Sequence, residues 1–192
     1  NDENVREIEN PLVMKNGWSI NEDVIKAVSE AMGPVKSVIK SPDLIVVYFT
    51  RGYDVGDMLG EIKKHAPKAK IFGYESGGAV FTEEGIHSGE NGALAIMGFK
   101  KKGLTVGVAV TEIENESDYR KAAEMTIKHA VADAGKKMTD RPSLVLMSSP
   151  IEVEENFTET ISKVFDNNIR VVGGSTVTAA SGAESGGATV AD

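Results

Sequence analysis

The chain of 192 residues contains two similar segments at a constant offset of 100 residues. Residues 42–48 (PDLIVVY) align with 142–148 (PSLVLMS), and residues 70–76 (KIFGYES) align with 170–176 (RVVGGST). Each segment is an apolar run, and the second run of each pair leads through glycine into small or polar residues. Because no gap is needed between the matches, the offset predicts two units of similar architecture, each with a glycine-containing turn after a strand.

Hydrophobic periodicity predicts alternating helices and strands in both halves of the chain. The helices are expected at residues 22–32, with Asn21 as the N-cap, and at 54–65, 117–134 and 154–165. Near-continuous apolar runs predict buried strands at residues 43–50, 71–73, 143–147 and 171–172. Residues 93–99 and 104–110 flank a Lys-Lys-Gly turn, which is typical of an antiparallel hairpin.

These elements predict an α/β fold with a mixed sheet and flanking helices. It consists of two helix–strand–helix–strand repeats, about 13–112 and about 113–192, and the first repeat adds the antiparallel hairpin. We expect residues 1–192 to form a single domain. The same offset would start a second hairpin after about residue 190, so we expect the second repeat to be truncated and its tail, 175–192, to be loop-like.

Composition excludes several classes of protein. The net charge is −8 and no stripe of lysine and arginine is present, which argues against nucleic-acid binding. The absence of cysteine excludes a disulfide scaffold, a thiol nucleophile and a cysteine zinc site. No apolar run approaches the roughly 18 residues of a membrane span. We expect a cytoplasmic protein, although a cleaved signal peptide would leave no trace in the sequence.

The loops that follow the predicted strands are candidates for a ligand site, because ligands of open α/β sheets bind at the carboxyl ends of strands. Four such loops, 51–54, 73–78, 148–151 and 173–176, would converge on the ligand. Glycine there lets backbone N–H groups approach a ligand, and Glu75 with Ser76 could recognise an amine or a hydroxyl. The competing explanation is that Gly73 only relieves a tight turn and that Glu75 is solvated. The predicted ligand-binding residues are Arg51, Tyr53, Gly73, Glu75, Ser76, Gly77, Gly173, Gly174, Ser175 and Thr176.

The three histidines lack the spacing of a zinc site, so we predict no metal site. His65 suits the end of a helix and His129 an exposed helix face. His87 lies in the glycine-containing segment 81–92, which could be a mobile lid or a loop that leads into the hairpin. Trp18 suits a core position or, alternatively, a pocket wall.

Several of these residues resemble a known family. The sequence Gly17-Trp18-Ser19 before an alanine-rich helix, the strand 43–49, the turn 73–78 and the later run 171–175 are similar to the N-terminal part of the FIST domain. The resemblance covers roughly residues 13–178. FIST domains usually have Gly-Cys-Ser/Thr-x-Gly at the turn, whereas this chain has Tyr74-Glu75-Ser76 after Gly73.

The resemblance implies a sensory module of signal-transduction proteins that binds small molecules such as amino acids. It also implies partners, namely a small-molecule ligand and a signalling output domain or protein. Some members of the family bind haem and respond to nitric oxide, so a haem sensor with His87 or His129 as axial ligand is one alternative function. A hydrolase or transferase that uses Ser76, Glu75 and His87 is another, although Gly-x-Ser-x-Gly is absent. We expect the sensory function rather than an enzyme.

Overall fold

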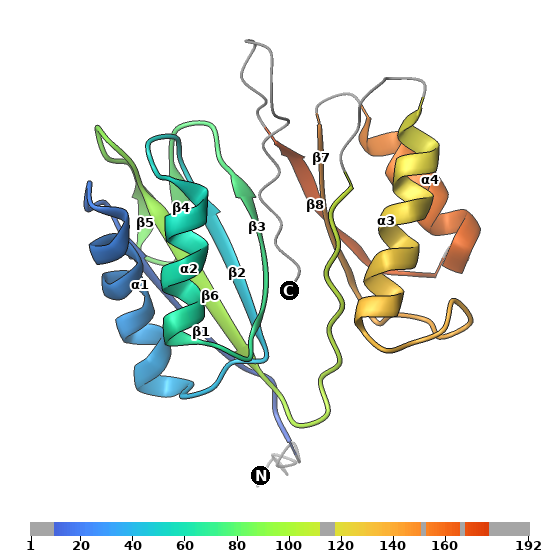
Figure 1. Ribbon diagram of the computed structural model, residues 1–192, viewed down its shortest axis with the longest axis horizontal. Coiled ribbons are helices and arrows are strands. Elements are labelled where there is room, and N and C mark those ends of the chain that lie inside the picture. Colours follow the sequence, from blue (N-terminus) through green and yellow to red (C-terminus); the bar gives the residue numbers. More distant parts are fainter. Residues whose placement is uncertain (1–9, 112–117, 151–152, 166–167, 177–192) are drawn as a thin grey trace, which may run out of the picture.

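The computed structural model describes residues 10–111, 118–150, 153–165 and 168–176. Helices and strands alternate along these residues, and the fold is mixed α/β, as the sequence predicts (Figure 1). The helices are α1 (Val24–Val38), α2 (Val55–His65), α3 (Tyr119–Asp133) and α4 (Glu154–Phe165). The strands are β1 (Val13–Ser19), β2 (Leu44–Phe49), β3 (Lys70–Glu75), β4 (Val80–Thr82), β5 (Gly85–His87), β6 (Leu94–Lys100), β7 (Val145–Pro150) and β8 (Val171–Thr176).

The first unit is a four-stranded mixed sheet with strand order β1-β6-β2-β3, covered on one face by α1 and α2. Strands β2 and β3 are parallel, and β6 is antiparallel to both β1 and β2. Alternate residues of β2, namely Ile45, Val47 and Phe49, face the two helices and are almost completely buried. The helices contribute their apolar face through residues such as Met32 and Ile62, so the first core forms between helices and sheet.

The second unit pairs β7 with β8 in parallel and covers them with α3 and α4. Met147 and Val171 belong to its core cluster, together with Phe157 and Ile161 of α4. Figure 1 shows α1 and α2 on one side of the molecule, α3 and α4 on the opposite side, and the strands between them.

The two parallel pairs have the same register. Val47 lies opposite Gly73 in the first unit, and Met147 lies opposite Gly173 in the second. In the two units, the residues that lie opposite each other are therefore equally far apart in the sequence, as the constant offset of 100 residues requires. The superposition of the two units as complete repeats stays a prediction, and the tail 177–192 lies outside the described residues.

The predicted hairpin between residues 93–99 and 104–110 is wrong. The turn exists, because Leu104 N donates to Lys101 O at 3.0 Å and Gly103 adopts a φ of +79°. However, β6 is already paired on both edges, with β1 and with β2. The chain after the turn instead runs toward α3, where the buried Val108 donates its backbone N–H to the Asp133 carboxylate at 2.7 Å.

Three local predictions in the first unit also need correction. Asp23, not Asn21, caps α1: its carboxylate accepts from Ile25 N and Lys26 N. No strand is expected from the sequence at residues 13–19, yet they form the edge strand β1, which pairs with β6. The segment 81–92 is not a plain loop, because β5 and most of β4 lie within it and pair as a small antiparallel hairpin.

Candidate functional site

The carboxyl ends of β2 and β3 bring two predicted site residues into direct contact. Arg51 follows β2, Glu75 ends β3, and Arg51 Nε lies 3.0 Å from Glu75 Oε1. The Glu75 side chain is only 22% exposed, whereas that of Arg51 is 57% exposed. The ion pair therefore combines an exposed cation with a partly desolvated carboxylate. It lies at the carboxyl ends of parallel strands, where the sequence predicted a ligand site.

Ser76 and Gly77 form the turn that leaves β3. Ser76 N donates to Phe49 O at 2.6 Å, and Ser76 Oγ donates to Ala79 O at 2.6 Å. These bonds fix the turn directly beside the Glu75 carboxylate. Gly77 is exposed at its tip, so its backbone faces solvent and is accessible to a ligand.

Tyr53 is a core residue rather than part of a binding surface. It is 8% exposed and belongs to the core cluster of the first unit, and its hydroxyl donates to Asn21 O at 2.6 Å. A Cβ atom placed on Gly92 would meet the Tyr53 ring at 2.6 Å, so the phenol is enclosed. Burial, followed by the charge of Glu30, raises the pKa of Tyr53.

Gly73 has a structural reason to be glycine. A Cβ atom at this position would lie 2.1 Å from the carbonyl oxygen of Val47 on the neighbouring strand. In the second unit, a Cβ atom on Gly173 would lie 1.9 Å from the carbonyl oxygen of Met147. Both glycines therefore allow close approach of two parallel strands, which makes each of them a packing residue.

The predicted loop 173–176 is instead the carboxyl-terminal part of strand β8, and residues 148–150 of the predicted loop 148–151 likewise belong to β7. Ser175 hydrogen-bonds to the Glu154 carboxylate at the start of α4. Gly174 lies opposite Ser148 of β7, and a Cβ atom placed on Gly174 would find no other atom within 4 Å. The backbone of Thr176 ends β8.

The structure places the predicted residues in two groups. Strands β3 and β8 both point to the same end of the molecule in Figure 1. Among the described residues, however, no hydrogen bond or ion pair joins Arg51, Glu75 or Ser76 to Ser175. Each group is therefore held by its own unit.

The histidines of the two alternative functions occupy separate environments. The imidazole of His87 is 8% exposed, stacks on Trp18 with ring centroids 3.6 Å apart, and lies 2.7 Å from Thr82 Oγ1 through Nε2. His129 is exposed on α3, and His65 at the end of α2 contacts Glu61 and Ser29. Within the described part of the chain, His87 makes no hydrogen bond to Ser76 or Glu75, and nothing favours haem ligation by His87 or His129.

Trp18 takes part in an anchor for the hairpin β4–β5 that the sequence did not indicate. Its indole N–H donates to Glu84 Oε2 at 2.8 Å, and the neighbouring Asn16 side chain binds the Glu83 carboxylate. Trp18 is half-buried against a small cluster with Val80. The hairpin is thereby fixed to β1 on the sheet face opposite α1 and α2.

An aromatic pair on that same sheet face was also missed. Tyr48 and Tyr74 are register partners of β2 and β3, and their rings meet edge to face with centroids 4.6 Å apart. Comparison of aligned positions could have drawn attention to them, because serine and glycine occupy the corresponding positions 148 and 174.

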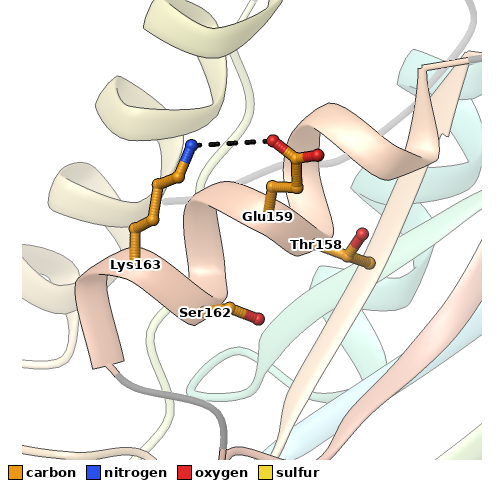
Figure 2. Close-up of a pocket in the computed structure, with 4 residues that line it drawn as sticks. All are labelled: Thr158, Glu159, Ser162 and Lys163. Carbon is orange, nitrogen blue, oxygen red and sulfur yellow. Dashed lines mark ion pairs between the residues drawn. The ribbon is translucent and has the colours of Figure 1, made fainter.

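A hollow of about 510 Å³ lies beside α4 (Figure 2). It is lined by Thr158, Glu159, Ser162 and Lys163, all from one helix. Glu159 is paired with Lys163 at 3.6 Å and with Arg120 at 3.2 Å, and all three side chains are more than half exposed. An exposed ion-pair network between α3 and α4 is typical of a solvated surface, and it gives this hollow no group prepared to hold a ligand.

The described residues contain neither a membrane-spanning helix nor a metal-binding cluster. No helix in these ranges is long and apolar enough to cross a membrane. In the same ranges, no three histidine, aspartate or glutamate side chains gather where they could hold a metal ion.

The chain matches a known protein family over more than half of its length. The family model described as FIST N domain matches residues 43–191, which include β2, β3 and the whole second unit. No curated protein matches the chain.

Proposed function

The chain belongs to the FIST N domain family, a family of sensory domains in signalling proteins, and on that premise we propose that it binds a small, amino-acid-like molecule. In this proposal, binding is passed to a signalling output domain or protein. The observation that carries it is the Arg51–Glu75 ion pair at the carboxyl ends of two parallel strands. A free amino acid offers an ammonium to the carboxylate and a carboxylate to the guanidinium.

The environment of the pair supports ligand exchange. Glu75 is held in place by β3 and largely shielded from water, whereas the exposed Arg51 can turn from Glu75 to a ligand carboxylate. The exposed backbone of Gly77 can supply a further N–H group. Residues 173–176 of β8 would contribute to the same ligand from the second unit.

The proposal is tested by calorimetric titration of the full chain with each of the twenty common amino acids. We expect at least one to bind and Glu75→Gln to weaken that binding by about 2 kcal/mol or more, because the ligand ammonium then loses a desolvated counter-charge. Arg51→Gln should weaken binding of the same amino acid through its carboxylate.

Glu124→Gln is the matched control, because Glu124 is an exposed glutamate on α3, in the other unit. It should leave the affinity within about 0.5 kcal/mol of the wild type. If no amino acid binds, or if Glu75→Gln and Glu124→Gln have equal affinities, the proposal is wrong.

A further inference from the structure

The aligned strand ends of the two units differ sharply in side-chain volume. At the carboxyl ends of β2 and β3, Tyr48 lies opposite Tyr74. At the register-equivalent place in β7 and β8, Ser148 lies opposite Gly174. In both units these residues are on the sheet face that is turned away from the helices, since their neighbours in sequence, such as Val47 and Met147, pack in the helix-covered cores.

In the first unit the two phenol rings fill this place by packing edge to face. In the second unit no ring occupies the equivalent positions. A Cβ atom placed on Gly174 would find no other atom within 4 Å, so there is space directly above its backbone. The face around it is apolar and accessible, because the side chain of Val172 is 58% exposed.

Ser148, the strand partner of Gly174 on this face, carries a hydroxyl that forms no hydrogen bond within the described residues. Its Oγ atom is buried. A buried hydroxyl that lacks a partner destabilises the folded protein, and such groups in native proteins call for a specific explanation. A ligand that covers Gly174 can supply the missing partner once the Ser148 hydroxyl turns from its covered position toward the open space. Glycine permits the close approach of that ligand to the strand.

We infer that Ser148 and Gly174 form a subsite that receives an aromatic ring bearing a polar atom, such as the phenol of tyrosine. The inference rests on the proposed function, because it names the side-chain class of the amino acid that the domain binds. The ring lies over Gly174, in the place that Tyr48 and Tyr74 fill in the first unit. The Ser148 hydroxyl forms a hydrogen bond with the phenolic oxygen.

The experiment compares three amino acids and one fragment on the full chain. L-tyrosine and L-phenylalanine differ only in the phenolic hydroxyl, L-alanine lacks the ring, and p-cresol is the tyrosine side chain alone. Calorimetry measures the affinities for the three amino acids. The binding of p-cresol is detected by the change in the NMR chemical shift of the Gly174 amide. We expect L-tyrosine to bind the wild type about tenfold more tightly than L-phenylalanine, and p-cresol to shift the Gly174 amide.

Two variants assign the effect to the subsite. Ser148→Ala should abolish the preference for L-tyrosine over L-phenylalanine, and its unliganded form should be at least as resistant to urea as the wild type, because an unpartnered hydroxyl is removed. Gly174→Val should abolish p-cresol binding by filling the space. The control Ser162→Ala, in the hollow beside α4, should keep the tenfold preference.

The outcomes separate the subsite from the proposed function. If L-alanine binds as tightly as L-tyrosine, the subsite is wrong and the proposed function stands. If no amino acid binds but p-cresol shifts Gly174 in the wild type and not in Ser148→Ala, the subsite stands and the proposed function is wrong. A loss of stability in Ser148→Ala, or a p-cresol response that this variant retains, would overturn the subsite.

Discussion

At the scale of single residues, Tyr48 shows how position in the sheet changes the chemistry of a side chain. Burial, then the proximity of Tyr74 and a hydrogen bond with its side chain, raise the pKa of Tyr48 far above its usual range. The folded protein therefore retains a proton that the unfolded chain releases at pH about 10. The stability due to this difference is complete below that pH and decreases as the pH rises above it.

We predict that Tyr48→Phe makes the protein less sensitive to alkali. The free energy of unfolding of the wild type should fall between about pH 9 and pH 11.5, and the fall should be smaller in the variant, because phenylalanine has no proton to release. A smaller part of the slope should remain, since the pKa of Tyr53 is also raised. Urea titrations at each pH measure the effect, and equal slopes in the two proteins would contradict it.

The sequence predicted the positions of the candidate residues well where the local strand pattern decides them, and poorly where contacts with distant segments decide them. Arg51 and Glu75 follow neighbouring parallel strands, so the strand pattern alone predicted that they lie at one edge. Tyr53 also follows β2, only two residues after Arg51. However, Asn21 and Gly92, which lie far from it in the sequence, enclose its ring. Nothing in the local pattern distinguishes an enclosed tyrosine from an accessible one.

At the scale of elements, periodicity predicted the four helices found in the described residues, because each carries an apolar face that recurs at helical spacing. Strand pairing was harder to predict. Strand β6 is adjacent in sequence to residues 104–110, yet it pairs with β1 and β2, whose positions are fixed by the first core. Which strands already pair with both edges of β6 is decided only when the whole sheet assembles. A local hairpin pattern in the sequence therefore cannot show that no edge is left for residues 104–110.

The parallel strand pairs themselves depend on one glycine each. We predict that Gly73→Ala and Gly173→Ala each lower the free energy of unfolding by about 1–3 kcal/mol, because the new Cβ would collide with the carbonyl oxygens of Val47 and Met147. Chemical denaturation of the purified variants measures the change.

Gly60→Ala is the matched control for the two strand glycines. Gly60 lies inside α2, is exposed, and has no atom within 4 Å of an added Cβ. The same substitution should therefore stabilise the protein there, by about 0.5–1 kcal/mol, through helix propensity. Stabilisation at Gly73 or Gly173 would show that the strands do not approach as closely as the structure has them.

At the scale of the whole molecule, one carboxylate ties the two units to each other. Asp133, at the end of α3, accepts a hydrogen bond from Lys70 Nζ at the start of β3 at 2.5 Å and from Val108 N at 2.7 Å. Burial opposes ionisation of Asp133, but the hydrogen bonds from Lys70 and Val108 and the lysine charge together lower its pKa. The contact lies at the opposite end of β3 from Glu75, so it can hold the units without covering the proposed site.

The first unit contains a tie of the same construction, which provides a control. Asp43 accepts from Lys100 Nζ at 2.5 Å and from Lys101 N at 3.1 Å, and all three residues belong to one unit. Asp133 and Asp43 thus each combine a lysine with a backbone N–H, but only Asp133 connects β3 to α3. The same substitution at Asp133 and at Asp43 therefore distinguishes the effect of losing a contact between the two units from the effect of losing a contact within one unit.

We predict that Asp133→Asn loosens the second unit while Asp43→Asn leaves it unchanged. The amide keeps the side-chain shape but loses the charge that pairs with Lys70, so about 1–2 kcal/mol of stabilisation should disappear. Hydrogen exchange should become faster in α3 and β7 of Asp133→Asn, with little change in β2. Because the pKa of Asp133 is lowered, the wild type should gain the same fast exchange only as the pH falls below about 4, through the pKa of the folded carboxylate. Equal exchange in α3 of the two variants would show that the Lys70–Asp133 contact does not couple the units.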